Sequence, residues 1–275
     1  MTKKDRIGSL TIHSACGEIR GNERESCLEF LGVPYARAER FAYCVSVENW
    51  EGTLDATDFG PGCPQNRAWH EHLEHPTRRF YKKEFREGAV YRYSEDCLNL
   101  NIFTPKEAEN CPVVLFFHGG GFDSGLNAES PFDGEGLARR GVIAVFANYR
   151  VGPLGYLCHE EIRKQYGRDG NFGLDDQLTA IRWVKKHIGA FGGDGENITL
   201  LGQSARGDLH PVSLPEPGEC RALPAGRHDV RRGTLPQIRP AEKSGGHPCL
   251  LAGLHGGGRL RKSGRAEKGL PGYAV

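Results

Sequence analysis

The order of apolar and polar residues along the first 205 positions changes between strand-like and helix-like patterns. Residues 7–35 alternate apolar and polar positions around Gly17 and Gly21, which predicts small antiparallel strands. Residues 94–105 repeat this alternation and end at a proline. Continuous apolar runs are typical of strands covered on both faces. Such buried strands are predicted at 113–117, 141–150 and 197–204.

One segment has the period of a helix. Between residues 174 and 191, Lys185 and Lys186 fall on the polar side, and apolar residues recur at helical spacing at Leu174, Leu178, Ile181, Val184 and Ile188. The resulting order of strand, crossover, strand, helix and strand predicts a mostly parallel sheet with helices on its faces. The predicted fold class is therefore α/β.

The composition of the chain changes at residue 206. The last 70 positions hold 13 Gly and 8 Pro, and Tyr273 is their only aromatic residue. Such a composition is typical of segments that cannot bury enough apolar surface to fold. We therefore expect residues 1–205 to form the folded part and residues 206–275 to be a non-native, disordered tail.

Charge also divides at this point. Residues 206–275 carry 12 basic residues (Lys and Arg) and 6 acidic residues (Asp and Glu), so this part is net positive. Residues 1–205 carry the other 24 basic and 29 acidic residues and are net negative. Because the basic residues of the tail are neither clustered nor interleaved with aromatic ones, no nucleic-acid partner is expected. No apolar run approaches membrane length, and the basic start of the chain lacks the apolar segment of a signal peptide. We expect a cytoplasmic protein without a membrane partner.

The cysteines and glycines exclude two other classes. Nine cysteines are scattered without CxxC spacing, so neither a disulfide framework nor a zinc site is indicated. The triplet Gly119–Gly121 is not part of a G-x-G-x-x-G that opens a helix after the first strand, which argues against a nucleotide-dependent oxidoreductase. No cofactor or metal is expected.

Two features carry possible chemistry. Glycines directly after a buried strand, as at 119–121, let the backbone turn sharply and direct its N–H groups at a bound oxygen. Ser204 ends the third buried strand, where a tight turn to a helix would expose its hydroxyl and direct the N–H of Ala205 to the same space. Each feature alone also fits a simpler role, namely a flexible turn for the glycines and a helix cap for the serine.

Together with their surroundings, these residues resemble the type-B carboxylesterase and cholinesterase family of α/β-hydrolases. The resemblance covers nearly all of residues 17–205. It is carried by "FLGVPYA", "RF", "FGPGCPQ", "SEDCLNLNIFTP", "PVVLFFHGGGF", "NYRVGPLGYL", "GNFGLDDQLTAIRWV", "FGGD" and "ITLLGQSA". It implies an α/β-hydrolase with a mostly parallel sheet, truncated here after the nucleophile elbow, and a serine esterase acting on a small-molecule carboxylic ester.

The resemblance also implies roles for single residues. Ser204 corresponds to the acyl-accepting nucleophile, and the N–H groups of Gly120, Gly121 and Ala205 correspond to the oxyanion hole. His118 corresponds to a structural position rather than to the catalytic base. Three acidic residues are expected to be turn and packing residues: Asp175, Asp176 and Asp194.

Two further positions concern cysteine pairing and the residue before the serine. Cys63 and Cys97 match a disulfide of the secreted members, so the resemblance implies a possible disulfide between them. The alternative, in a protein without a signal peptide, is that both stay reduced. Gln203 stands where the family usually has glutamate before the serine, which is a mild departure from its pattern.

The resemblance ends abruptly after Ala205. The family pattern is G-x-S-x-G-G followed by a helix, whereas this chain has G-Q-S-A-R-G and three prolines at 211, 215 and 217. A side chain at Arg206 would collide with the neighbouring strand. A proline inside a helix costs about 3 kcal/mol or more. The expected helix therefore cannot form from these residues.

A shifted reading frame explains this change. When permitted codons for "RALPAGRHDVRRG" are read one nucleotide later, they give "GPFQRAAMMSGG", a string of the type that the family has after its serine. The step from His228 and Asp229 to two methionines leaves only third bases free. We expect one extra nucleotide near the junction of Ala205 and Arg206, from a sequencing error or a real mutation.

The change after Ala205 leaves the expected serine without its catalytic base. In the family, the histidine base and its acid partner lie far downstream of the serine, beyond residue 275, and no catalytic role is carried over to the tail histidines His210, His228, His247 and His255. The chain is thus expected to be a catalytically incomplete fragment of a carboxylesterase. The alternative is a non-catalytic cholinesterase-like binding domain, which would need neither the serine nor the glycine triplet.

Overall fold

The structure is a computed structural model that describes residues 6–65, 79–80, 83 and 90–203. The chain divides into two units, Met1–Ile238 and Arg239–Val275, and all described residues belong to the first. Among these residues, no helix has the length and apolar character needed to cross a membrane. The predicted boundary between residues 205 and 206 lies outside the described residues and stays a prediction.

The N-terminal residues form antiparallel strands, as the alternation between residues 7 and 35 predicts. Three strands follow one another across the sheet: β1 (Arg6–Ser14), β2 (Gly17–Arg24) and β3 (Leu28–Pro34). Gly17 begins β2 with a φ of +131°, and a Cβ there would lie 2.8 Å from the indole nitrogen of Trp50. The tight turn between β1 and β2 therefore requires glycine.

Three short strands complete the N-terminal part. The strand β6 (Thr53–Asp55) pairs parallel with β2 in the main sheet. The strands β4 (Ala36–Arg37) and β5 (Val45–Ser46) pair antiparallel and form a separate two-stranded sheet.

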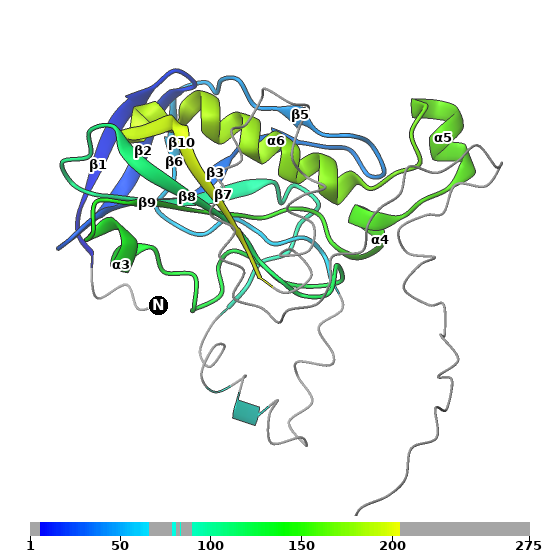
Figure 1. Cartoon of the computed structure of the whole chain (residues 1–275), viewed down its shortest axis with the longest axis horizontal. Coiled ribbons are helices and arrows are strands. Elements are labelled where there is room, and N and C mark those ends of the chain that lie inside the picture. Colours follow the sequence, from blue (N-terminus) through cyan, green and yellow to red (C-terminus); the bar gives the residue numbers. More distant parts are fainter. Residues whose placement is uncertain (1–5, 66–78, 81–82, 84–89, 204–275) are drawn as a thin grey trace, which may run out of the picture. The chain divides into compact units, whose positions relative to one another are not determined.

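Four further strands continue the main sheet (Figure 1): β7 (Asn99–Thr104), β8 (Cys111–Phe117), β9 (Ile143–Ala147) and β10 (Gly193–Gly202). The strand order is β1-β2-β3-β7-β9-β8-β10. The strands β9, β8 and β10 are parallel, whereas β7 pairs antiparallel with both of its neighbours. The sheet is therefore mixed, and its parallel part contains the three strands predicted from continuous apolar runs. Of these, β9 is buried throughout as predicted, whereas the buried positions of β8 alternate with half-buried ones.

Burial along two strands differs from the sequence pattern. All six residues of β7 are buried, although their alternation predicts one covered face. The reason is that Ile102 packs into one hydrophobic cluster and Phe103 into another, on opposite faces of the sheet. Conversely, β10 is half-buried, because among the described residues β8 is its only neighbour in the sheet.

Helix α6 (Phe172–His187) is the predicted helix, and it begins two residues earlier than expected. It ends at His187, and the expected last turn is a 3₁₀ helix, η2 (Ile188–Phe191). Gly192 follows with a φ of +81°, a conformation that favours glycine and stops the helix. Three shorter helices among the described residues are α3 (Glu135–Ala138), α4 (Gly152–Tyr156) and α5 (Glu160–Tyr166).

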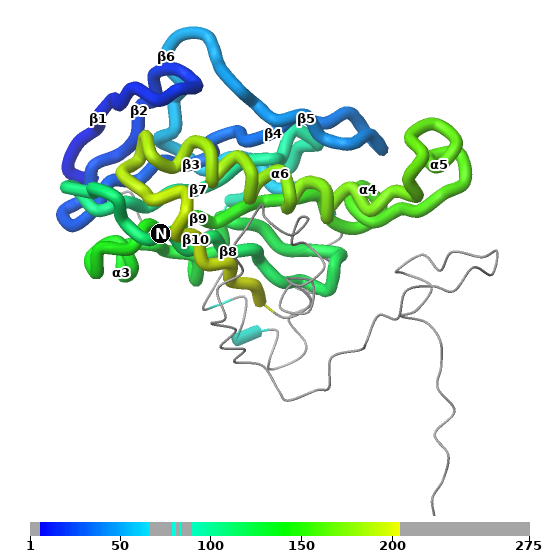
Figure 2. The backbone as a smooth tube through the Cα atoms, turned by 45° about the horizontal axis from the view of Figure 1, so that its top comes forward, coloured from blue at the N-terminus to red at the C-terminus, as the bar shows by residue number. Residues whose placement is uncertain are grey.

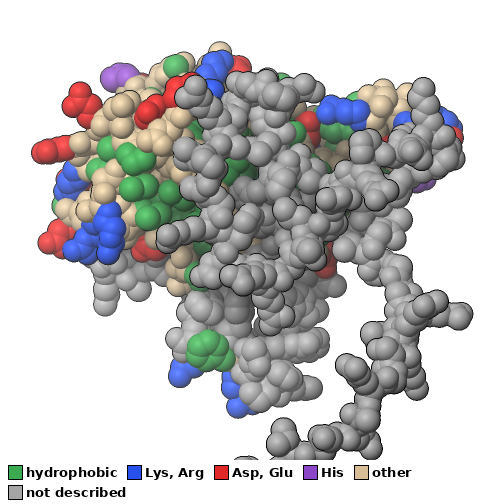
Figure 3. All heavy atoms as spheres, viewed as in Figure 1, with side chains coloured by type: hydrophobic (Ala, Val, Ile, Leu, Met, Phe, Trp, Pro, Cys, Tyr) green, Lys and Arg blue, Asp and Glu red, His purple; other side chains and the backbone are tan. Residues whose placement is uncertain are grey.

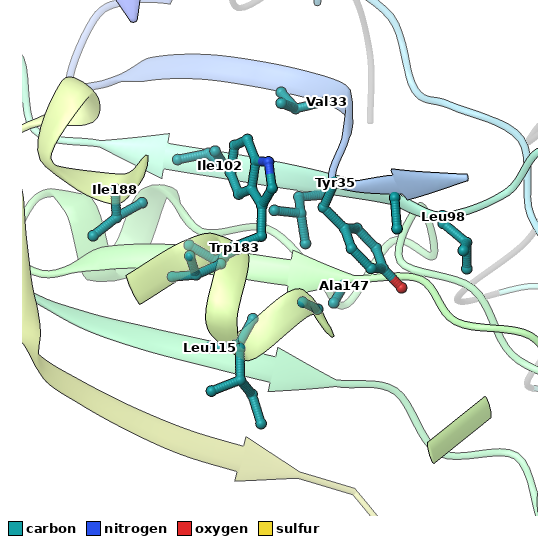
Figure 4. Packing of buried hydrophobic residues seen from close by; sticks show 14 of the residues in the cluster. Val33, Tyr35, Leu98, Ile102, Leu115, Ala147, Trp183 and Ile188 are labelled. Carbon is teal, nitrogen blue, oxygen red and sulfur yellow. The ribbon is translucent and has the colours of Figure 1, made fainter. Parts of the chain in front are cut away.

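The main hydrophobic cluster lies between α6 and the sheet. Figure 4 shows the side chain of Trp183 on α6 beside Ile102 of β7 and Tyr35, which lies between β3 and β4, and all three side chains are at most 2% exposed. A fully buried large apolar side chain contributes about 1.5–3 kcal/mol, so this layer fixes α6 on the sheet. The smaller cluster on the opposite face includes Phe103, Phe132 and Ala138 of α3.

Candidate active site

The Gly119–Gly121 triplet lies directly after the carboxyl end of β8, separated from it by His118. Gly120 has a φ of +127° and Gly121 a φ of +63°, conformations that L side chains rarely adopt. The loop then folds back, because the N–H groups of Asp123 and Ser124 both donate hydrogen bonds of 3.1 Å to the Gly120 carbonyl oxygen. The result is a compact turn at the end of the strand.

The space around this turn requires glycine at position 120 but not at position 121. A Cβ on Gly120 would clash with the backbone of Ser124, whereas a Cβ on Gly121 would point into open space. Within the described part of the chain, neither glycine N–H donates to a backbone oxygen. An oxyanion hole would need both N–H groups as donors.

The end of β10 lies next to this loop. Gly202 is in register with Phe117 at the end of β8, and the N–H of Gln203 donates to the Phe117 carbonyl oxygen at 3.3 Å. Figure 2 shows β10 running alongside β8. Because the two strands are parallel, the chain leaves both at the same edge of the sheet, where ligands of α/β folds bind. Ser204 and Ala205 follow at once but lie outside the described residues, so their geometry stays a prediction.

His118 packs beneath the glycine loop. It is 2% exposed, and its ring stacks on that of Tyr149 with 4.2 Å between the centroids. Its Nδ1 lies 2.9 Å from the Gly119 carbonyl oxygen and 3.0 Å from the Tyr149 hydroxyl oxygen. The Tyr149 hydroxyl also donates to the His118 carbonyl oxygen. These contacts agree with the expected structural role of this histidine.

The three acidic residues expected to have turn and packing roles have different surroundings. Asp194 accepts a hydrogen bond of 2.8 Å from the N–H of Glu196, which is a turn contact as expected. Asp175 is partly exposed and pairs with Arg168 at 3.3 Å. Asp176 is buried in an ion pair, described next, which the sequence pattern does not distinguish from the other two.

The ion pair of Asp176 joins α6 to the end of β9. The Arg150 side chain donates to both carboxylate oxygens, from Nε at 2.9 Å and from Nη2 at 2.7 Å, and its N–H donates at 3.0 Å. Both side chains are almost fully buried. Burial raises the pKa of Asp176 above its usual value, and the guanidinium of Arg150 opposes that shift. The pair fixes the segment that follows β9.

Cys63 and Cys97 are free thiols in the structure, and both are buried. Hydrogen bonding with Cys63 and burial raise the pKa of Cys97 well above its usual value, so this thiol is neutral. The Cys63 sulfur accepts a hydrogen bond of 3.4 Å from the N–H of Val151. The two side chains therefore meet, as the resemblance implies, while a disulfide between them stays a prediction.

The visible described surface carries charges of both signs (Figure 3). Figure 3 shows acidic and basic side chains interspersed over the visible face of the described residues. Among those residues, no group of three or more His, Cys, Asp or Glu side chains is placed to hold a metal ion.

The sequence patterns do not single out Gln65, which contacts the loop, or Arg150, which pairs with Asp176. Both belong to segments that carry the resemblance, "NYRVGPLGYL" and "FGPGCPQ", but neither was given a role. The side-chain amide of Gln65 bonds to the backbone of Gly125, at the far end of the loop, with its oxygen accepting at 2.8 Å. A single polar residue outside any periodic segment gives no pattern from which such a contact could be predicted.

The two glycines make a matched pair of substitutions. Gly120→Ala is expected to displace the loop, because the added methyl group would overlap the Ser124 backbone. Gly121→Ala should retain the loop at a cost of about 1–2 kcal/mol, since only its left-handed conformation is disfavoured. Hydrogen exchange of the loop and thermal unfolding of both variants would test this. Equal effects of the two substitutions would contradict it.

Comparison with known proteins gives the family. Residues 8–214 match the carboxylesterase family. The chain is 38% identical over 199 residues to the para-nitrobenzyl esterase of Bacillus subtilis (strain 168), covering 70% of this chain and 37% of that protein. It is 36% identical over 217 residues to the fumonisin B1 esterase of Sphingopyxis macrogoltabida, and this match covers 76% of this chain and 37% of that protein. The chain thus spans a little over a third of the length of these relatives.

Solved structures agree with this result. A PNB esterase structure superimposes with a TM-score of 0.61 at 36% identity, covering 72% of this chain and 39% of the other. An esterase from Clostridium hathewayi gives a TM-score of 0.62 at 33% identity, covering 72% and 38%. The fold is that of the α/β-hydrolases, with the glycine loop and the end of β10 at one edge of the sheet. The chain belongs to the carboxylesterase family.

Proposed function

We propose that this chain carries the nucleophile and the oxyanion hole of a carboxylic ester hydrolase. The observation that carries the proposal is the register of β8 and β10, in which Gly202 lies opposite Phe117. Three residues after Phe117 comes Gly120, and two residues after Gly202 comes Ser204. Neighbouring strands thus deliver the serine and the glycine N–H groups to the same edge of the sheet.

The proposed reaction is acyl transfer through a covalent intermediate. The Ser204 hydroxyl oxygen attacks the carbonyl carbon of a small-molecule ester while its proton passes to a base. The negative charge that develops on the carbonyl oxygen is stabilised by the N–H groups of Gly120, Gly121 and Ala205. The alcohol then leaves, and water hydrolyses the acyl-enzyme. The two relatives are named for different esters, so no particular ester is carried over.

The conformation of the glycine loop favours hydrolysis over the alternative of a binding domain. Adhesion would need neither the serine nor the glycine triplet, whereas an oxyanion hole uses the N–H groups of Gly120 and Gly121 as donors. The clash that a Cβ on Gly120 would make shows how closely the loop closes around this position.

We further propose that the 275-residue chain alone is catalytically incomplete. Attack by the serine needs a base and an acid that orients it, and the resemblance puts both downstream of residue 275. The family match ends at residue 214, close to the expected change of reading frame. The nucleotide sequence across codons 200–210 tests the frame directly, because an unambiguous read without an extra base excludes a sequencing error.

The catalytic part of this proposal is tested with the purified chain. We expect the 275-residue chain and its Ser204→Ala variant to hydrolyse 4-nitrophenyl acetate at the same low rate, because a hydroxyl without a base is a poor nucleophile. The control is para-nitrobenzyl esterase assayed with the same substrate. If the 275-residue chain hydrolyses the ester faster than its Ser204→Ala variant by a large factor, it possesses a base, and the proposal that it is catalytically incomplete is refuted.

A further inference from the structure

Gln65 makes an unusually complete contact with one residue of the glycine loop. Its side-chain oxygen accepts a hydrogen bond of 2.8 Å from the Gly125 N–H, and its side-chain nitrogen donates one of 3.0 Å to the Gly125 carbonyl oxygen. The same nitrogen donates to the Cys63 carbonyl oxygen at 2.9 Å. One amide thus satisfies both backbone groups of Gly125.

Gly125 is the residue through which this contact reaches the start of the loop. It has a φ of +111°, and a Cβ there would clash with the Gly119 carbonyl oxygen and with His118 Nδ1. The two ends of the loop are therefore in direct contact, while its middle closes on the Gly120 carbonyl oxygen. A displacement of Gly125 would move Gly119 and Gly120 with it.

The segment that carries Gln65 is itself fixed to the sheet. The Asn99 side chain donates to the Pro61 carbonyl oxygen at 2.9 Å. The side chain of Asn127, two residues after Gly125, donates to the Asn99 carbonyl oxygen at 3.2 Å. Because Asn99 begins β7, both sides of the Gln65 contact are held by the same strand. The side chain can thus hold the loop in one place.

We propose that Gln65 is a positioning residue that holds the Gly119–Gly125 loop so that the N–H groups of Gly120 and Gly121 face the reacting ester. An amide suits this role because it has a donor and an acceptor side by side. Alanine has neither, and ionised glutamate lacks the donor. The catalytic part of this inference, that the loop stabilises an oxyanion, rests on the proposed function. The structural part, that Gln65 fixes the loop, is independent of it.

Hydrogen–deuterium exchange of the full 275-residue chain tests the positioning. We expect Gln65→Ala to accelerate exchange of the Gly125 amide by about tenfold, because it removes the acceptor of that N–H. Faster exchange should extend over residues 119–125 and leave β9 and α6 unchanged. The control is Gln165→Ala, which removes an exposed glutamine far from the loop in sequence. The readout needs no catalysis, so it succeeds or fails independently of esterase activity.

A second variant separates positioning from general packing. Gln65→Glu retains the shape of the side chain and regains a donor when its carboxyl is protonated. We expect the loop of this variant to exchange rapidly at pH 7.5, because the carboxylate faces the carbonyl oxygens of Cys63 and Gly125 without a donor. Protection should return at pH 4, below the usual glutamate pKa of about 4.3, after correction for the intrinsic exchange rate. His118 and Cys63 are titratable and lie beside the contact, so the wild type is measured at both pH values.

The outcomes are distinct. Local, pH-reversible loosening of the loop supports the proposal. Unchanged exchange at Gly125 in both variants would overturn it, and so would loosening spread evenly over the sheet or a Gln65→Glu variant without pH dependence. If Gln65→Ala fails to fold, the comparison of Gln65→Glu at the two pH values still tests whether Gln65 positions the loop.

Discussion

Removal of one nucleotide between the codons of Ala205 and Arg206 is expected to raise ester hydrolysis by about a thousandfold or more. The corrected frame would supply the glycine that the turn needs in place of Arg206, and further downstream the base and its acid partner. In serine hydrolases the loss of the nucleophile or base alone costs several orders of magnitude. Regaining the base should therefore restore a rate of that size.

The measurement is the hydrolysis of 4-nitrophenyl acetate by the products of the original and the corrected gene. The control is Ser204→Ala in the corrected frame, which should return the rate to that of the 275-residue chain. A corrected product that shows no Ser204-dependent hydrolysis would contradict the frame hypothesis, and so would a corrected frame that encodes no histidine downstream.

Asp176→Ala is expected to lower the free energy of unfolding by about 3–5 kcal/mol, because it leaves the buried charge of Arg150 without its partner. The two carboxylate oxygens accept three hydrogen bonds of 2.7–3.0 Å from Arg150. Chemical denaturation of the purified chain measures the loss.

The neighbouring aspartate provides the control for this substitution. Asp175→Ala removes a carboxylate from the same helix, but its partner Arg168 is exposed, so the expected loss is below about 1 kcal/mol. Replacing both members of the buried pair, as in Arg150→Met with Asp176→Leu, should cost less than Asp176→Ala alone, since no unpaired charge remains. Equal losses for Asp175→Ala and Asp176→Ala would contradict the interpretation.

Much of the fold could be predicted because it depends on local patterns. The alternation in residues 7–35 and the apolar run at 113–117 are direct consequences of which faces the strands bury, and both strand predictions are confirmed. The family resemblance, carried by short motifs, is confirmed by the match over residues 8–214. Periodicity could not show that β7 is buried on both faces, because an alternating pattern does not reveal a second layer.

The parts of the site that could not be predicted depend on contacts between distant segments. Asp175 and Asp176 are adjacent in sequence, and only the rotation of α6 about its axis decides which one is buried. Gln65 and Gly125 are 60 positions apart, and no spacing rule joins them. The carboxyl ends of β8 and β10 could be assigned to one edge because parallel strands always bring their ends together.

The pairing of β10 with β8 contains an irregularity between Gly193 and Ile198, after which the two strands stay in step up to Gly202. Sliding this last stretch by a single residue would carry the serine about 3.3 Å along the sheet and turn it to the opposite face. The preceding five residues can absorb such a change, since they are already out of step. Evolution could therefore lengthen or shorten the chain before Ile198 at little cost, whereas the same change between Ile198 and Ser204 would misplace the proposed nucleophile.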